Sequence, residues 1–166
     1  MRLPRLRLAP IFQIPLLLLL AATPVAGAND PAAPPLFFAL SVPDLEASIR
    51  WYTEKLDLEA TRLPANASAR VALLQGEGLL VELVEHSAAF DLAARVPEAT
   101  GRYLVHGPFK VGFFVHDLDA AVARLRSRGA MFQGSVFTDD VLRAKSILVL
   151  DNDGNVLQLF ERLPAK

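Results

Sequence analysis

The sequence contains no cysteine in its 166 residues. A disulfide framework is therefore excluded, and so is an anchor that depends on a lipid-bearing cysteine. The length corresponds to about one domain. Such a chain must be stabilised by burial of a hydrophobic core, and the roughly 130 residues after its N-terminal segment are enough to build one.

The sequence also lacks an excess of either charge, with 17 Lys and Arg against 18 Asp and Glu. The first 28 residues hold three arginines and no acid, so 14 basic and 18 acidic side chains remain after them, a net charge of about −4. Without a basic stripe, we expect no nucleic-acid partner. No nucleophile elbow, phosphate-binding loop or HExxH motif is present either.

Residues 1–28 have the features of a secretory signal peptide. A basic start, MRLPRLR, precedes an apolar stretch that ends in Ala26-Gly27-Ala28. We therefore predict cleavage after Ala28, a secreted or periplasmic location in a bacterium, and no stable membrane insertion after cleavage. The alternative is a membrane anchor, but a spanning helix needs about 20 apolar residues and this stretch would have to accommodate three prolines.

Two parts of the chain, residues 36–63 and 110–136, repeat one pattern. Each begins with a short apolar run and Val-x-Asp-Leu, and each continues with the apolar spacing of an amphipathic helix. Asp44 and Asp117 stand where a helix N-cap is expected, because a carboxylate can accept from free backbone N–H groups. The expected buried helix faces are Leu45, Ile49, Tyr52 and Leu56, and Leu118, Ala121, Val122 and Leu125. Three strand-like segments follow each helix, so each half has the order β-α-β-β-β.

The acidic run at residues 151–154, Asp-Asn-Asp-Gly, could be a cation-binding loop or a turn. An EF-hand loop needs a glutamate six residues beyond its glycine, and Phe160 stands there. The flanking segments SILVL and NVLQLF are apolar and β-branched, which favours a hairpin turn.

The repeated pattern, with VPDLEASIRWYTEKL near its start and VLDNDGNVLQLFE at its end, resembles the vicinal oxygen chelate superfamily. This superfamily includes glyoxalase I, bleomycin-resistance proteins and extradiol dioxygenases. The resemblance covers about residues 36–162 and is specific to the fold, which hosts many reactions.

The expected fold class is α+β, with two βαβββ modules that form a curved eight-stranded sheet around a cup and helices outside. A Pro/Ala linker at residues 29–35 precedes a glyoxalase-like domain at 36–163. Within that domain the boundaries are module one at 36–86, a connector at 87–109 and module two at 110–162.

In the metal-dependent members of this superfamily, four inward side chains bind one divalent ion, usually His, Glu, His or Gln, and Glu. The resemblance places these positions at Phe37, Glu82, Lys110 and Gln158. Phenylalanine has no donor atom and lysine is protonated, so Glu82 and Gln158 alone supply too few ligands for a tight site. We therefore expect neither a metal nor another cofactor.

Lys110 and Glu82 place opposite charges where the ion would lie. They could form a structural ion pair, and breaking such a pair when buried commonly costs about 3–5 kcal/mol. Alternatively, Lys110 could bind an anionic ligand, or burial could tune it for acid–base chemistry.

The cup is expected to be apolar. Phe114 shares a strand face with Lys110 and Gly112, whereas Phe113 should face the helices. With Phe37, Phe114 would suit a small organic molecule, although both rings could equally fill an empty cup. The predicted ligand-binding residues are Phe37, Glu82, Lys110, Phe114 and Gln158, and no catalytic residue is assigned.

The sequence thus predicts an exported, metal-independent glyoxalase-like protein that binds a small organic molecule, similar to sequestering proteins of the bleomycin-resistance type. One alternative is a lyase, isomerase or dioxygenase of this fold with a degenerate metal site. Another is a non-catalytic structural or partner-binding domain whose cup is filled by its own phenylalanines. A homodimer is compatible with each.

Overall fold

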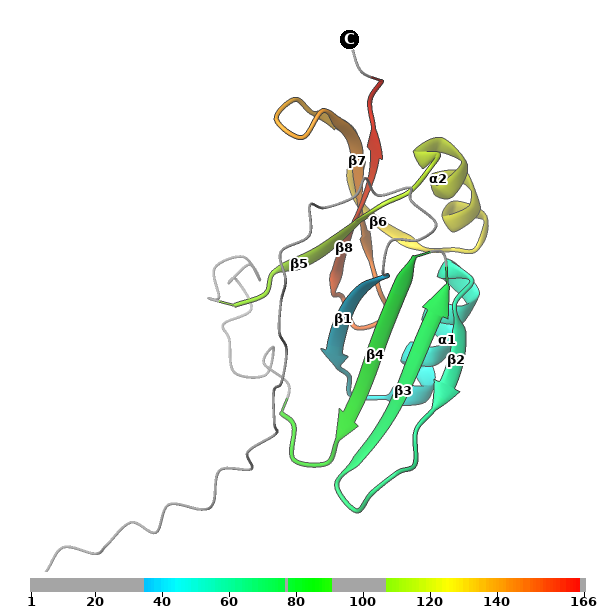
Figure 1. The fold of residues 1–166 in the computed structure, drawn as a ribbon, viewed down its shortest axis with the longest axis vertical. Helices are drawn as coiled ribbons and strands as arrows, with labels where there is room; N and C mark the ends of the chain where they lie inside the picture. Colours follow the sequence, from blue (N-terminus) through cyan, green and yellow to red (C-terminus); the bar gives the residue numbers. More distant parts are fainter. Residues whose placement is uncertain (1–34, 77, 91–106, 165–166) are drawn as a thin grey trace, which may run out of the picture.

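The computed structural model describes residues 35–76, 78–90 and 107–164, which run through β-α-β-β-β twice (Figure 1). The first module contains β1 (Leu36–Ser41), α1 (Leu45–Leu56), β2 (Glu59–Arg62), β3 (Ala69–Gly76) and β4 (Leu79–His86). The second contains β5 (Lys110–Phe114), α2 (Leu118–Ser127), β6 (Met131–Asp139), β7 (Ala144–Leu150) and β8 (Val156–Arg162). The predicted α+β fold of two βαβββ modules is confirmed. The predicted signal peptide, nearly all of the linker and much of the connector lie outside the described residues.

The eight strands are divided between two four-stranded sheets, in the orders β1-β4-β3-β2 and β5-β8-β7-β6. In each sheet the first strand pairs in parallel with the last strand of its module, and the other pairs are antiparallel. Figure 1 shows α1 behind β3 and β4, and α1 packs against these two strands. In the second module, α2 contacts β8. Each sheet therefore has a helix on one face, and we call the other its open face.

Both helices begin at the predicted caps. The Asp44 carboxylate accepts from the Ala47 amide at 3.0 Å, and the Asp117 carboxylate accepts from the Ala120 amide at 2.8 Å. The predicted helix faces are also confirmed, since Leu45, Ile49, Tyr52 and Leu56, and Leu118, Ala121, Val122 and Leu125, are all buried. One hydrophobic core joins residues of both modules. Neither helix of the described ranges is long and apolar enough to cross a membrane.

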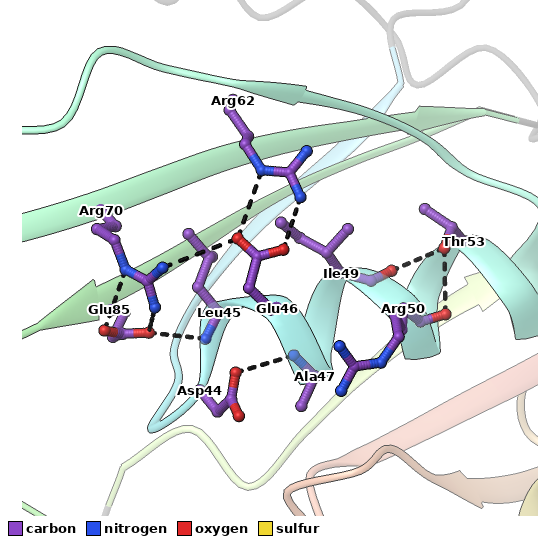
Figure 2. Close-up of polar contacts among 10 residues, drawn as sticks. All are labelled: Asp44, Leu45, Glu46, Ala47, Ile49, Arg50, Thr53, Arg62, Arg70 and Glu85. Atoms are coloured by element: carbon purple, nitrogen blue, oxygen red, sulfur yellow. Dashed lines mark hydrogen bonds and ion pairs between the residues drawn. The ribbon is translucent and has the colours of Figure 1, made fainter.

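A second carboxylate, supplied by the sheet, also holds each helix start. Glu85 near the end of β4 accepts from the Leu45 amide, and Glu161 near the end of β8 accepts from the Leu118 amide, both at 2.8 Å. Figure 2 shows the first of these contacts, with the Arg70 guanidinium bound to the same Glu85 carboxylate. These bonds fix each helix on its own sheet, because they satisfy backbone donors that a helix start leaves free.

The two modules contact each other at the C-terminal ends of the helices. Lys55 Nζ donates to the Arg128 carbonyl oxygen, and Arg128 Nη1 donates to the Lys55 carbonyl oxygen at 3.1 Å. Lys55 is the eleventh residue of α1, and Arg128, directly after α2, is the eleventh residue counted from Leu118 as the first. The contact is therefore reciprocal, as expected for two copies of one module related by an approximate twofold axis.

Candidate functional site

Strand register shows how the predicted site residues are distributed. On β4, Glu82 lies opposite Ala39 of β1, and on β8, Gln158 lies opposite Gly112 of β5. Phe37 is two residues before Ala39, and Lys110 is two residues before Gly112. Phe37 and Glu82 therefore occupy one open face, and Lys110 and Gln158 occupy the equivalent positions of the other. Within the described ranges, no hydrogen bond or ion pair joins the two pairs.

On the first sheet, the open face is accessible and largely apolar. Phe37 is 54 % exposed. Glu82 is half-buried, and its neighbours in the chain, Val81 and Leu83, are fully buried on the side of α1. This alternation fixes the direction of Glu82, which points away from the helix.

On the second sheet, Gln158 is only 3 % exposed and is already hydrogen bonded. Its Nε2 donates to Ser146 Oγ at 2.7 Å, and Ser146 Oγ donates to the Leu159 carbonyl oxygen at 3.0 Å. The Gln158 side chain is therefore part of an internal chain of hydrogen bonds on the sheet.

Phe114 lies beside two residues that sequence reasoning missed, Phe160 and Arg162. The Phe114 and Phe160 ring centroids are 5.3 Å apart, and the Arg162 guanidinium lies 4.3 Å from the centre of the Phe114 ring. Both residues could have been predicted from the sequence, because residues 158, 160 and 162 of a strand lie on the same face. As predicted, Phe113 is buried in the core beneath α2.

Lys110 is exposed at the start of β5, with its Nζ 5.5 Å from the centre of the Phe109 ring. None of the ion pairs among the described residues includes Lys110. The structural ion pair with Glu82 that the sequence suggested is thus not formed. The physical reason is that the two residues belong to separate sheets, with Lys110 on an edge strand and Glu82 on an inner one.

The four aligned positions do not fit a divalent metal ion. Phe37 has no donor atom, Lys110 carries a cation, and the amide of Gln158 is held by Ser146. Only Glu82 is left as a carboxylate ligand, and a tight site needs three or four donors. In residues 35–76, 78–90 and 107–164, no three His, Cys, Asp or Glu side chains gather at one point.

The Asp-Asn-Asp-Gly run forms the predicted turn between β7 and β8. Asp151 is only 1 % exposed, and it accepts from the backbone amides of Asp153 and Asn155 and from Asn155 Nδ2, at 2.7–2.9 Å. Its carboxylate also accepts from the Tyr52 hydroxyl of α1 at 3.0 Å. Burial, followed by the Asp151 charge, raises the pKa of Tyr52, so this hydroxyl remains a donor at physiological pH.

Beside this network, Ser48 Oγ donates to the Asp153 carboxylate at 3.0 Å. Burial raises the pKa of Asp153, and the neighbouring Asp151 charge adds to the effect. The turn is thus a structural contact between the modules rather than a cation loop.

A cavity of about 350 Å³ lies between the second sheet, α2 and the first module. The lining includes Phe113, Phe114 and Leu159 of the sheet, Ala121 and Leu125 of α2, and Leu56 and Leu79 of the first module. The cavity is therefore a gap at the junction of the two modules, and of the five predicted ligand-binding residues it is lined by Phe114 alone.

Residues 36–159 match the model of the Glyoxalase/Bleomycin resistance protein/Dioxygenase superfamily. The fold is similar to the glyoxylase/bleomycin resistance protein/dioxygenase domain from Frankia sp. EAN1pec, with a TM-score of 0.60 and 22 % identity over 77 % of this chain and 90 % of that one. It is also similar to TioX from Micromonospora sp. ML1, with a TM-score of 0.58 and 20 % identity over 79 % of this chain and 100 % of that one. A glyoxalase family protein from Enterococcus faecalis gives a TM-score of 0.59 and 20 % identity, over 76 % of this chain and 94 % of that one. No curated protein matches the chain. At these identities, the structural likeness shows the fold alone.

Proposed function

The chain belongs to the glyoxalase/bleomycin resistance protein/dioxygenase superfamily, and we propose that it is an exported member that binds a small organic molecule without a metal ion. The ligand lies on the open strand faces that form the cup of this fold. The lyase, isomerase or dioxygenase alternative needs a metal site for which these positions lack the donors.

The observation that carries the proposal is a set of aromatic side chains at and beside the positions where metal-dependent relatives have ligands. Phe37, at one of these positions, is exposed on one open face, and the half-buried Phe114 and Phe160 lie together on the other. Pockets for small organic molecules are mostly apolar, with a few placed polar groups. Glu82 and Arg162 provide such groups here.

A thermal-shift experiment tests both parts of this proposal. We expect Ni²⁺, Zn²⁺, Mn²⁺ and Fe²⁺ to leave the Tm nearly unchanged, whereas a panel of small aromatic molecules contains compounds that raise it. A ligand at 100 times its Kd adds about 2.7 kcal/mol to the free energy of unfolding, which such an assay detects. The aromatic shift should weaken in Phe114→Ala and persist in Val141→Ala, a control in the exposed β6–β7 turn.

A saturable metal shift would contradict metal independence if it is lost in Glu82→Ala and kept in Glu59→Ala, an exposed carboxylate on the edge strand β2. If neither metals nor aromatic molecules shift the Tm, the result would favour the alternative that the protein is a structural domain whose cup is filled by its own side chains. One observation favours this alternative, because the Phe160 ring fills the space over Gly112.

Export rests on the basic start, apolar stretch and small-residue exit of residues 1–28. Expressed as the full chain in a Gram-negative host, the protein should be recovered from the periplasm, beginning at Asn29 by mass spectrometry. Membrane-bound protein with an intact N-terminus would instead identify the segment as an anchor.

A further inference from the structure

The open face of strands β5 and β8 carries a shelf made of Lys110, Gly112, Phe114, Phe160 and Arg162. We infer that this shelf selects a planar organic anion, whose ring lies against Phe114 and Phe160 and whose carboxylate binds Arg162. This inference rests on the proposed function and names the class of ligand for it.

Strand alternation and direct contacts place these five residues on one face. Phe114 lies opposite Phe160 in the register of the two strands. The intervening residues face the other way, since Phe113 is buried in the core and Glu161 bonds to the Leu118 amide at the start of α2. Arg162 therefore lies on the shelf, whereas the adjacent Glu161 lies on the opposite face of β8.

Two aromatic rings form the base of the shelf. The Phe114 and Phe160 rings are tilted by 32° with centroids 5.3 Å apart, and both side chains are half-buried. The Phe160 ring lies over Gly112, where an added Cβ would be 2.7 Å from Phe160 Cε2. A planar group can stack on such rings.

The charges at the two ends of the shelf are both positive, with Lys110 at the start of β5 and Arg162 at the end of β8. Both side chains are exposed, and neither belongs to any ion pair among the described residues. By contrast, the arginines paired with carboxylates are Arg62, Arg70, Arg124 and Arg128.

The Phe114 ring holds the Arg162 guanidinium in place at 4.3 Å, and no carboxylate of the described residues pairs with the guanidinium N–H groups. A guanidinium presents two parallel donors that match a carboxylate, which makes Arg162 the residue that recognises the ligand charge. Lys110 lies farther away and adds to the positive potential, which salt screens.

The test compares 2-naphthoate with its neutral analogue 2-naphthamide, titrated into the protein purified after expression of the full chain. Affinity is measured by calorimetry, and the binding face by NMR shifts of backbone amides. We expect naphthoate to bind about tenfold more tightly, the factor that corresponds to 1.4 kcal/mol. Its shifts should centre on Gly112, Phe114 and Phe160. Arg162→Gln should remove the preference for the acid, and Lys110→Gln should reduce it by a smaller factor that disappears at high salt.

Arg126→Gln is the matched control, because Arg126 also stacks on a phenylalanine, at 5.4 Å from the centre of the Phe132 ring, but on another element. It should leave the preference intact. Equal affinity for the two probes, a preference that survives in Arg162→Gln, or shifts centred elsewhere would overturn the anion shelf while leaving small-molecule binding in place. Failure of both probes also overturns it, and the proposed function fails as well only if the wider aromatic panel gives no shift.

Discussion

At the scale of single residues, the Phe160 ring explains why a glycine stands at position 112 of β5. A Cβ added there would lie 2.7 Å from Phe160 Cε2 and 3.3 Å from the Gln158 carbonyl oxygen. The first distance is far inside van der Waals contact, and the second leaves the new methyl group little room to move away. The Phe160 ring therefore depends on a glycine on the neighbouring strand.

We predict that Gly112→Ala destabilises the protein by about 1–3 kcal/mol, the usual cost of inserting a methyl group into a packed site. Equilibrium urea unfolding measures this effect. In a Phe160→Leu background, where the ring edge is absent, the same substitution should cost clearly less. An equal cost in both backgrounds would show that the strand backbone, rather than the Phe160 ring, sets the limit.

The residue scale also shows what sequence reasoning could not reach. Alternation along β8 was sufficient to place Gln158 on the face opposite Leu157 and Leu159, because the side-chain period of a strand is two. Its partner, Ser146, was not predictable, because Gln158 lies directly opposite Leu148 and bonds diagonally to Ser146. Choosing that partner requires the register of two strands and the rotamers of both side chains.

At the scale of elements, the N-terminus of α1 depends on the Glu85 carboxylate of β4 (Figure 2). The Arg70 guanidinium, followed by the Leu45 amide, holds the pKa of Glu85 below its usual value of 4.5. The folded state thus binds fewer protons than the unfolded state. The stabilisation that the Glu85 carboxylate contributes is fully present above about pH 4.5, and it is lost as the pH falls through the lower pKa that Glu85 has in the folded state.

We therefore predict that Glu85→Gln flattens the acid side of the stability profile below about pH 4.5. The measurement is urea unfolding at a series of pH values. Arg70→Gln should flatten the profile as well, because it removes the main cause of the shift. The acid side of the stability profile should be no flatter in the double variant than in Glu85→Gln alone. A steeper or unchanged acid limb in Glu85→Gln would contradict this assignment.

The elements themselves were predictable from local patterns. Asp44 and Asp117 mark the helix starts through chemistry that needs only neighbouring backbone amides, and the apolar spacing after each gives the buried face. The sheet contacts that reinforce these starts, from Glu85 and Glu161, span 40 and 43 residues and so leave no local signal. For the same reason, the division of eight strands into two sheets required the three-dimensional structure.

At the scale of the whole molecule, the bond between Tyr52 and Asp151 joins α1 of one module to the β7–β8 turn of the other. Both residues are almost completely buried, and they lie 99 positions apart in the sequence. A buried hydrogen bond to a charged group contributes about 1.5–3 kcal/mol, and removing its donor leaves the carboxylate less well solvated.

We predict that Tyr52→Phe lowers the free energy of unfolding by about 1.5–3 kcal/mol in urea titrations at neutral pH. A double-mutant cycle with Asp151→Asn should show coupling of about 0.5–3 kcal/mol, as expected for residues in contact. Additive effects in this cycle would mean that the hydroxyl and the carboxylate act separately, and that other contacts hold the modules together.

The last prediction concerns whether the two open faces converge on one cup. Phe37 and Glu82 lie on one sheet, and Lys110 and Gln158 lie at the equivalent register of the other. If the faces converge, Phe37→His, Lys110→His and Gln158→Glu together with Glu82 supply two imidazoles and two carboxylates, a donor set that suits a divalent transition metal. The triple variant should then bind Ni²⁺ or Zn²⁺ with a saturable rise in Tm, while each single variant and the triple variant with Glu82→Ala should not. A triple variant that keeps the native circular dichroism spectrum and binds no metal would show that the four positions do not share a site. Any ligand would then bind to the open face of one sheet alone.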